Sequence, residues 1–167
     1  MDKRLLDTLL GEGKLIELCN LIKEKKRDRN ERRPVNDWCN QQETRYITPL
    51  KSSTNIDSSV LLNASCIMGS QLAVDAVTST QLRRVITGFH RLQETFKNSE
   101  LREAEVSKLR LNLAYATARN NKIAKLSSVL DAMLSKVQIE RGNEDFDRVV
   151  TFMEGVIAYH KLAGGGD

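Results

Sequence analysis

The chain has 167 residues, of which 40% are hydrophobic and 29% are charged, and its formal net charge is +4. These values are typical of one soluble globular domain that is long enough to bury a core. They exclude a membrane-spanning protein, because no stretch reaches the roughly 18 consecutive apolar residues that crossing a bilayer requires.

The first third of the chain is predicted to hold helix followed by a long loop. Apolar residues recur at helical spacing through residues 3–28, and Gly11 and Gly13 divide this stretch into a short helix and a longer one. From Pro34 to about Ser59 the periodicity is lost, both prolines occur, and serines and asparagines cluster. We therefore expect a long loop or an insertion in this region.

The next two expected helices cover residues 61–96. The first spans residues 61–77 and is predicted to break or bend at Gly69. Thr78 supplies an N-cap for the second, whose apolar residues fall at i, i+3, i+4, i+7, i+10 and i+14. These residues are Leu82, Val85, Ile86, Phe89, Leu92 and Phe96. Asn98 and Ser99 are expected to end this helix and to cap its successor.

Three further helices are expected in the last part of the chain, over about residues 101–119, 121–137 and 143–161. In the first of them, four residues widen the apolar side, as in a helix packed between others. They are Leu111, Ala114, Tyr115 and Ala118. Tyr115 and Tyr159 are both expected in the core, with an outward hydroxyl, and His160 is expected to pack or to interact with the helix dipole.

Few aromatic residues and many Leu, Ala, Lys, Glu and Arg favour helix over sheet. The predicted fold is therefore all-α, a compact bundle of about five to six helices with a long irregular loop in its N-terminal half. Residues 1–69 are expected to hold the first helix and the loop, residues 70–163 the helical core, and residues 164–167 a flexible tail.

Positive charge is concentrated in one part of the chain. Between Ser79 and Lys125 there are ten Lys and Arg against four Asp and Glu. Arg84, Gly88 and Arg91 share a helix face, because they lie one and two turns apart. Such a field on a helical scaffold favours a polyanionic partner. A solvated, solubilising surface explains the same charges, and charge alone leaves both interpretations open.

Catalytic and metal-binding patterns are absent from the sequence. His90 and His160 have no nucleophile or carboxylate at a diagnostic spacing, and the acidic residues are dispersed. Three widely spaced cysteines without a CxxC pair argue against a zinc site and against a disulfide framework. The first residues also lack a signal peptide. We expect a cytoplasmic protein that is not an enzyme and binds no cofactor, metal or small-molecule substrate.

Three segments in order resemble a known family. They are TSTQLRR at residues 78–84, LRLNLAYATAR at residues 109–119 and FMEGVIAYHK at residues 152–161. Together they resemble the small subunit of the type III-A (Csm) CRISPR effector complex, over roughly residues 70–163. The resemblance implies a non-catalytic, all-helical subunit, several copies of which stack along the duplex of CRISPR RNA and target RNA. Its implied partners are both RNAs, the other Csm subunits and neighbouring copies of itself, with RNA and DNA cleavage left to those other subunits.

The candidate RNA contacts combine this resemblance with the basic positions. Nine residues are predicted to contact phosphate without reading sequence. They are Arg83, Arg84, Arg110, Arg119, Lys122 and Lys125, with Arg91, Lys108 and Lys161 as secondary contacts. Two rival interpretations remain. The chain is either such a subunit or a helical adapter that binds only proteins. A helix-turn-helix regulator at residues 80–97 is disfavoured, because no short turn links that helix to a preceding partner.

Overall fold

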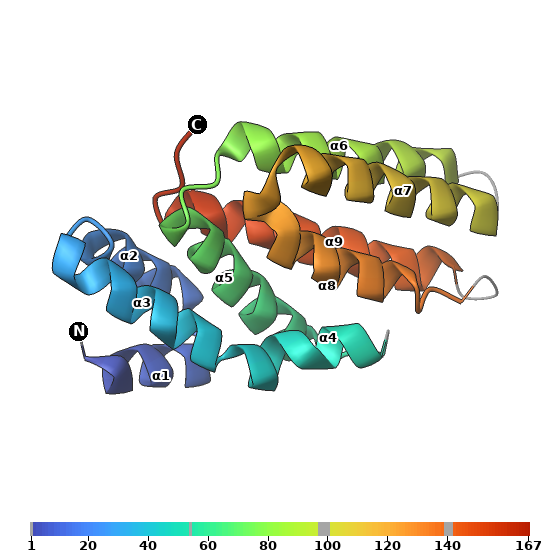
Figure 1. Cartoon of the computed structure of the whole chain (residues 1–167). Coiled ribbons are helices and arrows are strands. Elements are labelled where there is room, and N and C mark those ends of the chain that lie inside the picture. Colours follow the sequence, from blue (N-terminus) through green and yellow to red (C-terminus); the bar gives the residue numbers. More distant parts are fainter. Residues whose placement is uncertain (1, 54, 97–100, 139–141) are drawn as a thin grey trace.

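The computed structural model describes residues 2–53, 55–96, 101–138 and 142–167, and these contain helices but no strand (Figure 1). The elements in chain order are α1 (Lys3–Gly11), α2 (Leu15–Lys25), α3 (Arg29–Gln41), the π-helix η1 (Glu43–Ile47), α4 (Thr48–Ser52), α5 (Ser58–Val74), α6 (Ser79–Phe96), α7 (Glu103–Arg119), the 3₁₀-helix η2 (Asn121–Ile123), α8 (Ala124–Leu134) and α9 (Gly142–Leu162). The all-α class is confirmed. The predicted count of five to six helices is wrong, because the described residues form more.

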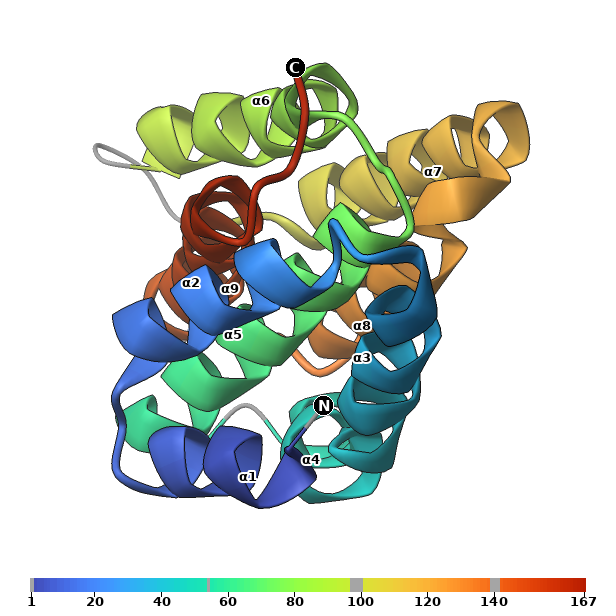
Figure 2. The ribbon, with the colours of Figure 1, turned by 90° about the vertical axis from the view of Figure 1, so that its left-hand side faces the viewer.

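Helices α5 and α9 form the centre of the molecule and make the most extensive contact between any two elements. Every residue of α5 from Ala64 to Val74 is buried, as expected of a helix that other elements surround. Helices α1, α2 and α3 lie on one side of α5, while α6, α7 and α8 lie on the other (Figures 1 and 2). A single cluster of buried apolar side chains runs from Leu6 to Ala163 and joins the two sides.

Gly69 allows α5 and α9 to cross at close range, and α5 continues through it without a break. A Cβ atom at this position would lie 2.6 Å from the carbonyl oxygen of Val156 and 2.7 Å from the backbone nitrogen of His160. One turn away, the Ser65 hydroxyl donates to the carbonyl of Phe152 at 3.2 Å. The predicted break at Gly69 is therefore wrong. The residue is small because the backbone of α9 occupies the space that a side chain would need.

The long loop predicted from Pro34 to Ser59 is also wrong, because α3, η1 and α4 fill most of it. Pro34 lies inside α3, where an interior proline costs a helix about 3 kcal/mol. Burial of Val35, Trp38 and Cys39 at helical spacing offsets this cost. In addition, the indole Nε1 of Trp38 donates to Asp7 Oδ1 at 2.8 Å.

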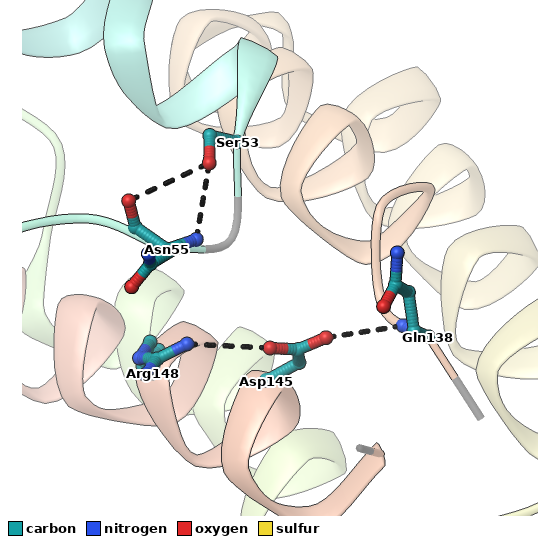
Figure 3. Close-up of polar contacts among 5 residues, drawn as sticks. All are labelled: Ser53, Asn55, Gln138, Asp145 and Arg148. Carbon is teal, nitrogen blue, oxygen red and sulfur yellow. Dashed lines mark hydrogen bonds and ion pairs between the residues drawn. The ribbon is translucent and has the colours of Figure 1, made fainter. Parts of the chain in front are cut away.

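The irregular connection between α4 and α5 is short. It holds a local turn in which the Ser53 hydroxyl accepts a hydrogen bond from the Asn55 backbone nitrogen at 3.1 Å (Figure 3). Asp57 then caps α5, accepting from the backbone nitrogen of Ser59 at 2.7 Å. The polar residues that suggested a long loop are therefore turn and cap residues over a few positions.

The expected stripe of α6 is confirmed, since five of its six residues are buried and Leu92 packs against the core. The predicted helix end at Asn98 and Ser99 lies outside the described residues. The broad apolar side predicted for α7 is wrong. Leu111 is 56% exposed and Tyr115 is 65% exposed, because α7 lies at the edge of the bundle and only its Val106–Leu113 side packs inward (Figure 2).

The C-terminal residues, expected to form a flexible tail, make defined contacts. The carbonyl of Gly166 accepts from the backbone nitrogen of Ser79 at 2.7 Å, and the carbonyl of Gly164 accepts from Lys26 Nζ. The domain boundary expected between residues 69 and 70 falls inside α5. No helix among the described residues is long and apolar enough to cross a membrane.

Candidate nucleic-acid interface

Helices α6 and α7 run side by side in opposite directions at the edge of the bundle (Figure 1). A capping box fixes the start of α6. The Thr78 hydroxyl accepts from the Gln81 backbone nitrogen at 3.2 Å, and Gln81 Oε1 accepts from the Thr78 backbone nitrogen at 2.9 Å. Because the Leu82–Phe89 stripe faces the core, the row that holds Arg84, Gly88 and Arg91 lies along the boundary with α7.

Two adjoining hollows lie along this boundary, with volumes of about 290 and 140 Å³. They share Gly88, Leu109 and Asn112 as lining residues, so they form one continuous depression. We call it the α6–α7 groove and define it by six residues. These are Arg84, Gly88, Arg91, Lys108, Leu109 and Asn112. A Cβ on Gly88 would lie 3.3 Å from Leu109 Cδ1, so the two helices approach each other closely at the floor of the groove.

The charge in the groove is predominantly positive and unpaired. Arg84, Arg91 and Lys108 are exposed, and no hydrogen bond or ion pair within the described part of the chain engages their side chains. The acidic lining residue, Glu105, accepts a hydrogen bond from Arg102 at 2.9 Å, and this contact lowers the pKa of Glu105. Three exposed cations with no partner among the described residues can each contact an external anion without breaking a contact of the fold.

Three other residues that were predicted to contact RNA already have partners inside the protein. They are Arg110, Lys161 and Lys125. Arg110 forms a two-pronged ion pair with Asp131 of α8, with distances of 2.7 and 3.2 Å. Lys161 contacts Asp167 at 2.8 Å. These pairs are exposed to solvent, so they contribute little to the stability of the fold. They nevertheless compete with an external phosphate.

Lys125 is engaged twice. Its Nζ lies 2.9 Å from Glu43 Oε2 and 2.9 Å from Asn40 Oδ1, and it ties α8 to η1 and α3. Lys122 is exposed and lies near Asp75 at the end of α5, as does Arg32. The structure therefore places Lys122 and Lys125 beside α3 and away from the α6–α7 groove.

Arg83 and Arg119 are exposed at the ends of the helix pair. Arg83 lies near Asp167 and lowers the pKa of that carboxyl group, after the larger effect of Lys161. Arg119 occupies the last turn of α7. The structure thus brings together Arg84, Arg91 and Lys108 and distributes the remaining six predicted residues over other surfaces.

Sequence reasoning missed two groups of residues. Asn112 lines the groove one turn after Lys108, and its position follows from the same helical spacing once α7 is paired with α6. Arg29, Arg32 and Arg33 line a separate hollow at the start of α3. These arginines were not predicted to form a binding site, because a mixed-charge run beside a proline is typical of a solvated loop.

The polar groups that could suggest catalysis have structural partners. Asp145 is buried in the first turn of α9, where it accepts from the backbone nitrogen of Gln138 at 3.2 Å and from Arg148 at 3.3 Å (Figure 3). His90 pairs with Glu154 across the α6–α9 contact at 3.0 Å. Among the described residues, no group of three or more His, Cys, Asp or Glu could hold a metal ion.

The three cysteines are free thiols in the core. The sulfur atoms of Cys19 and Cys66 lie 3.5 Å apart and join α2 to α5. Burial raises the pKa of Cys39 to about 12, so this thiol stays protonated at neutral pH. The cysteines therefore act here as small apolar residues.

The model of a protein family matches most of the chain. The family is described as Csm2 Type III-A, and the match covers residues 57–166, from the N-cap of α5 to the penultimate residue. It includes α6 and α7 and hence the whole groove. No curated protein and no solved structure matches the chain.

Proposed function

The chain belongs to the Csm2 Type III-A family, the small subunit of the type III-A Csm complex, and we propose that it holds the phosphate backbone of the guide RNA–target RNA duplex without reading its sequence. In this proposal the subunit is non-catalytic and acts in the cytoplasm. Several copies stack along the duplex and contact one another and the other Csm subunits. The family match confirms the resemblance of the three sequence segments.

The observation that carries the proposal is the α6–α7 groove. Arg84 and Arg91 lie about 10 Å apart along α6, given the rise of 1.5 Å per residue, and Lys108 lies across from them on α7. Guanidinium and ammonium groups at such intervals can contact several phosphates of one strand, and each contact releases condensed counterions. This free-energy term does not depend on the base sequence.

The groove has few means to read bases. Leu109 and Gly88 form its floor, and the uncharged polar side chains that line it beside the cations are Asn112 and Thr95. In a complex whose sequence specificity comes from pairing with the guide, a subunit that holds only backbone suffices. Stacking of copies would multiply a weak individual affinity through effective concentration.

A second candidate function is that of a protein adapter with no contact to nucleic acid. Leu111 and Tyr115 support it, because they lie one turn apart on α7 and are more than half exposed. Exposed apolar pairs of this kind are common at protein interfaces. The two functions differ in what they predict for RNA binding by the isolated chain.

Fluorescence anisotropy of the purified chain with labelled RNA separates them. Single-stranded RNAs of unrelated sequence and an RNA duplex should all bind at low salt and weaken at moderate salt. The adapter function predicts no binding to any of these RNAs even at low salt. That result would overturn the RNA-binding proposal.

The variant Arg84→Ala/Arg91→Ala/Lys108→Ala tests the groove itself. We expect its affinity to fall by a similar factor for every single-stranded RNA, with a log–log salt slope shallower by about 2. The matched control is Arg4→Ala/Lys14→Ala/Lys136→Ala, which removes the same charge at exposed positions outside the groove. Equal loss of affinity in both variants would show that net charge, and not the groove, controls binding.

A further inference from the structure

A second hollow lies where the start of α3 meets the end of α5, with a volume of about 250 Å³. Arg29, Arg32 and Arg33 line it on one side, and Val74 and Asp75 line it on the other. Positions 29, 32 and 33 are spaced i, i+3 and i+4, so all three guanidinium groups project from one face of α3. Residues 29–33 precede the family match at residues 57–166.

Two lysines, Lys122 of η2 and Lys125 of α8, lie close to this cluster. Partial burial raises the pKa of Asp75, whereas Lys125, Arg32 and Lys122 lower it, which places all three cations within electrostatic range of that carboxylate. We call this surface the α3 junction and define it by Arg29, Arg32, Arg33, Asp75 and Lys122. It brings together residues that are about 90 positions apart in the sequence.

Part of this charge has a structural explanation. Arg32 Nε donates to the carbonyl of Val74 at 3.0 Å, and Lys26 Nζ donates to the carbonyl of Ala73 at 3.1 Å. Both contacts satisfy orphan carbonyls at the C-terminus of α5, where a positive charge also suits the helix dipole. Lys125 is engaged by Glu43.

The remaining cations exceed what that helix end requires. Arg29, Arg33 and Lys122 are exposed, and no hydrogen bond or ion pair among residues the structure describes engages their side chains. Arg32 is held in place by its contact with Val74, which lowers the entropy lost when an anion binds beside it. Guanidinium groups in this arrangement offer planar forks that match phosphate oxygens.

We propose that the α3 junction is a second phosphate-binding site, which takes phosphodiester groups of an RNA strand independently of the α6–α7 groove. None of the residues that line its hollow is aromatic, so the site would hold backbone and not stacked bases. The proposal does not require the groove to bind RNA. It gives this chain an additional contact, whose three arginines lie outside the part that the family model matches.

The test is the full-length variant Arg29→Ala/Arg33→Ala, which leaves Arg32 in place to cap α5. Anisotropy with unrelated single-stranded RNAs should show weaker binding by one common factor and a log–log salt slope shallower by about 1.4, as expected for two lost phosphate contacts. The charge-matched control Arg4→Ala/Lys136→Ala should show a smaller change. Equal affinity and equal slope in the junction variant and the control would overturn the proposal.

Two further experiments test whether the site requires arginine and whether its ligand is RNA. Arg29→Lys/Arg33→Lys keeps the charges, so it should restore most of the salt slope while recovering only part of the affinity. Inorganic phosphate, compared with chloride at matched ionic strength, tests for a site that takes a lone anion. A junction variant that lowers stabilisation by inorganic phosphate but leaves RNA binding unchanged would overturn the assignment to RNA.

The groove variant, measured in parallel, keeps the two proposals apart. If only the groove variant loses affinity, the proposal that the α3 junction binds RNA is overturned, and the proposed function remains supported. Loss in the junction variant alone would support the junction and remove the groove from the proposed function.

Discussion

The imidazole of His160 is a polar group that forms part of the core. Its side chain is fully buried, and its Nε2 donates to the carbonyl of Val77 at 2.8 Å. Gly165 packs directly on the imidazole, since any Cβ there would overlap the ring. Burial lowers the pKa of His160, and the nearby Lys26 and Lys161 lower it further, against the effect of the Val77 hydrogen bond. The ring is therefore neutral in the folded state at neutral pH.

This lowered pKa predicts a pH-dependent stability. Below about pH 6.5 the unfolded chain protonates His160 while the folded chain does not, so the free energy of unfolding should fall as pH drops toward the folded pKa. Above pH 6.5 both states are neutral and the residue contributes no slope. Urea unfolding of the wild type and of His160→Gln between pH 7.5 and 5.5 measures the effect. The same pH dependence in both proteins would contradict it.

Ala76 has a positive φ of 56°, which is unusual for a residue with a side chain. It follows α5, and the next backbone nitrogen, that of Val77, donates to the carbonyl of Leu72 at 3.0 Å. This is the hydrogen bond of a Schellman motif, whose left-handed position usually holds glycine. Ala76→Gly should therefore stabilise the protein, by about 1 kcal/mol.

Thermal and urea unfolding check this prediction. The matched control is Ala114→Gly, at an exposed position within α7, which should instead destabilise by about 1 kcal/mol. Destabilisation by both substitutions would show that the left-handed conformation of Ala76 carries no cost.

At the scale of the element, the crossing of α5 and α9 determines how the two sides of the molecule are held together. Gly69 of α5 faces the backbone of α9, and Gly155 of α9 faces Ser65 of α5, with a Cβ at Gly155 only 2.7 Å from that serine side chain. Small residues on both helices bring their backbones close, so the packing tolerates little added volume.

The substitution Gly69→Ala tests this packing. Its methyl group would overlap backbone atoms of Val156 and His160, which cannot rotate away, so we expect a loss of about 1–3 kcal/mol or more in the free energy of unfolding. Gly11→Ala is the control, because nothing lies within 4 Å of an added Cβ there. A Gly69→Ala protein as stable as the control would contradict the observed crossing.

The sequence predicted elements well where apolar spacing was dense. The stripe from Leu82 to Phe96 defined α6, and Thr78 marked its start. Prediction failed for α3, because its buried residues Val35, Trp38 and Cys39 follow a proline inside a polar stretch. Only tertiary burial outweighs the local cost of that proline.

Part of the candidate site was also predictable. The shared face of Arg84 and Arg91 follows from their spacing of seven residues. That Lys108 lies opposite them depends on the alignment of α6 with α7, which helical periodicity does not determine. Tyr115 was misplaced for a related reason, because an apolar residue on a helix at the edge of a bundle can face solvent.

At the scale of the whole molecule, the excess of positive charge between Ser79 and Lys125 divides between surfaces. Arg84, Arg91 and Lys108 line the α6–α7 groove, whereas Lys122 joins the arginines of α3. A chain with two separate basic surfaces can hold a nucleic-acid strand at more than one point. Each contact adds to the affinity and to its salt dependence.

The most direct measurement uses the assembled complex. Csm subunits and CRISPR RNA would be combined with wild-type chain, with Arg84→Ala/Arg91→Ala/Lys108→Ala or with the charge-matched control, and retention of target RNA would be followed as salt is raised. We predict equal assembly of all three proteins, with target RNA released at lower salt from the groove variant for every guide sequence. Release at the same salt from all three complexes would contradict a role for this subunit in holding the RNA backbone through its groove.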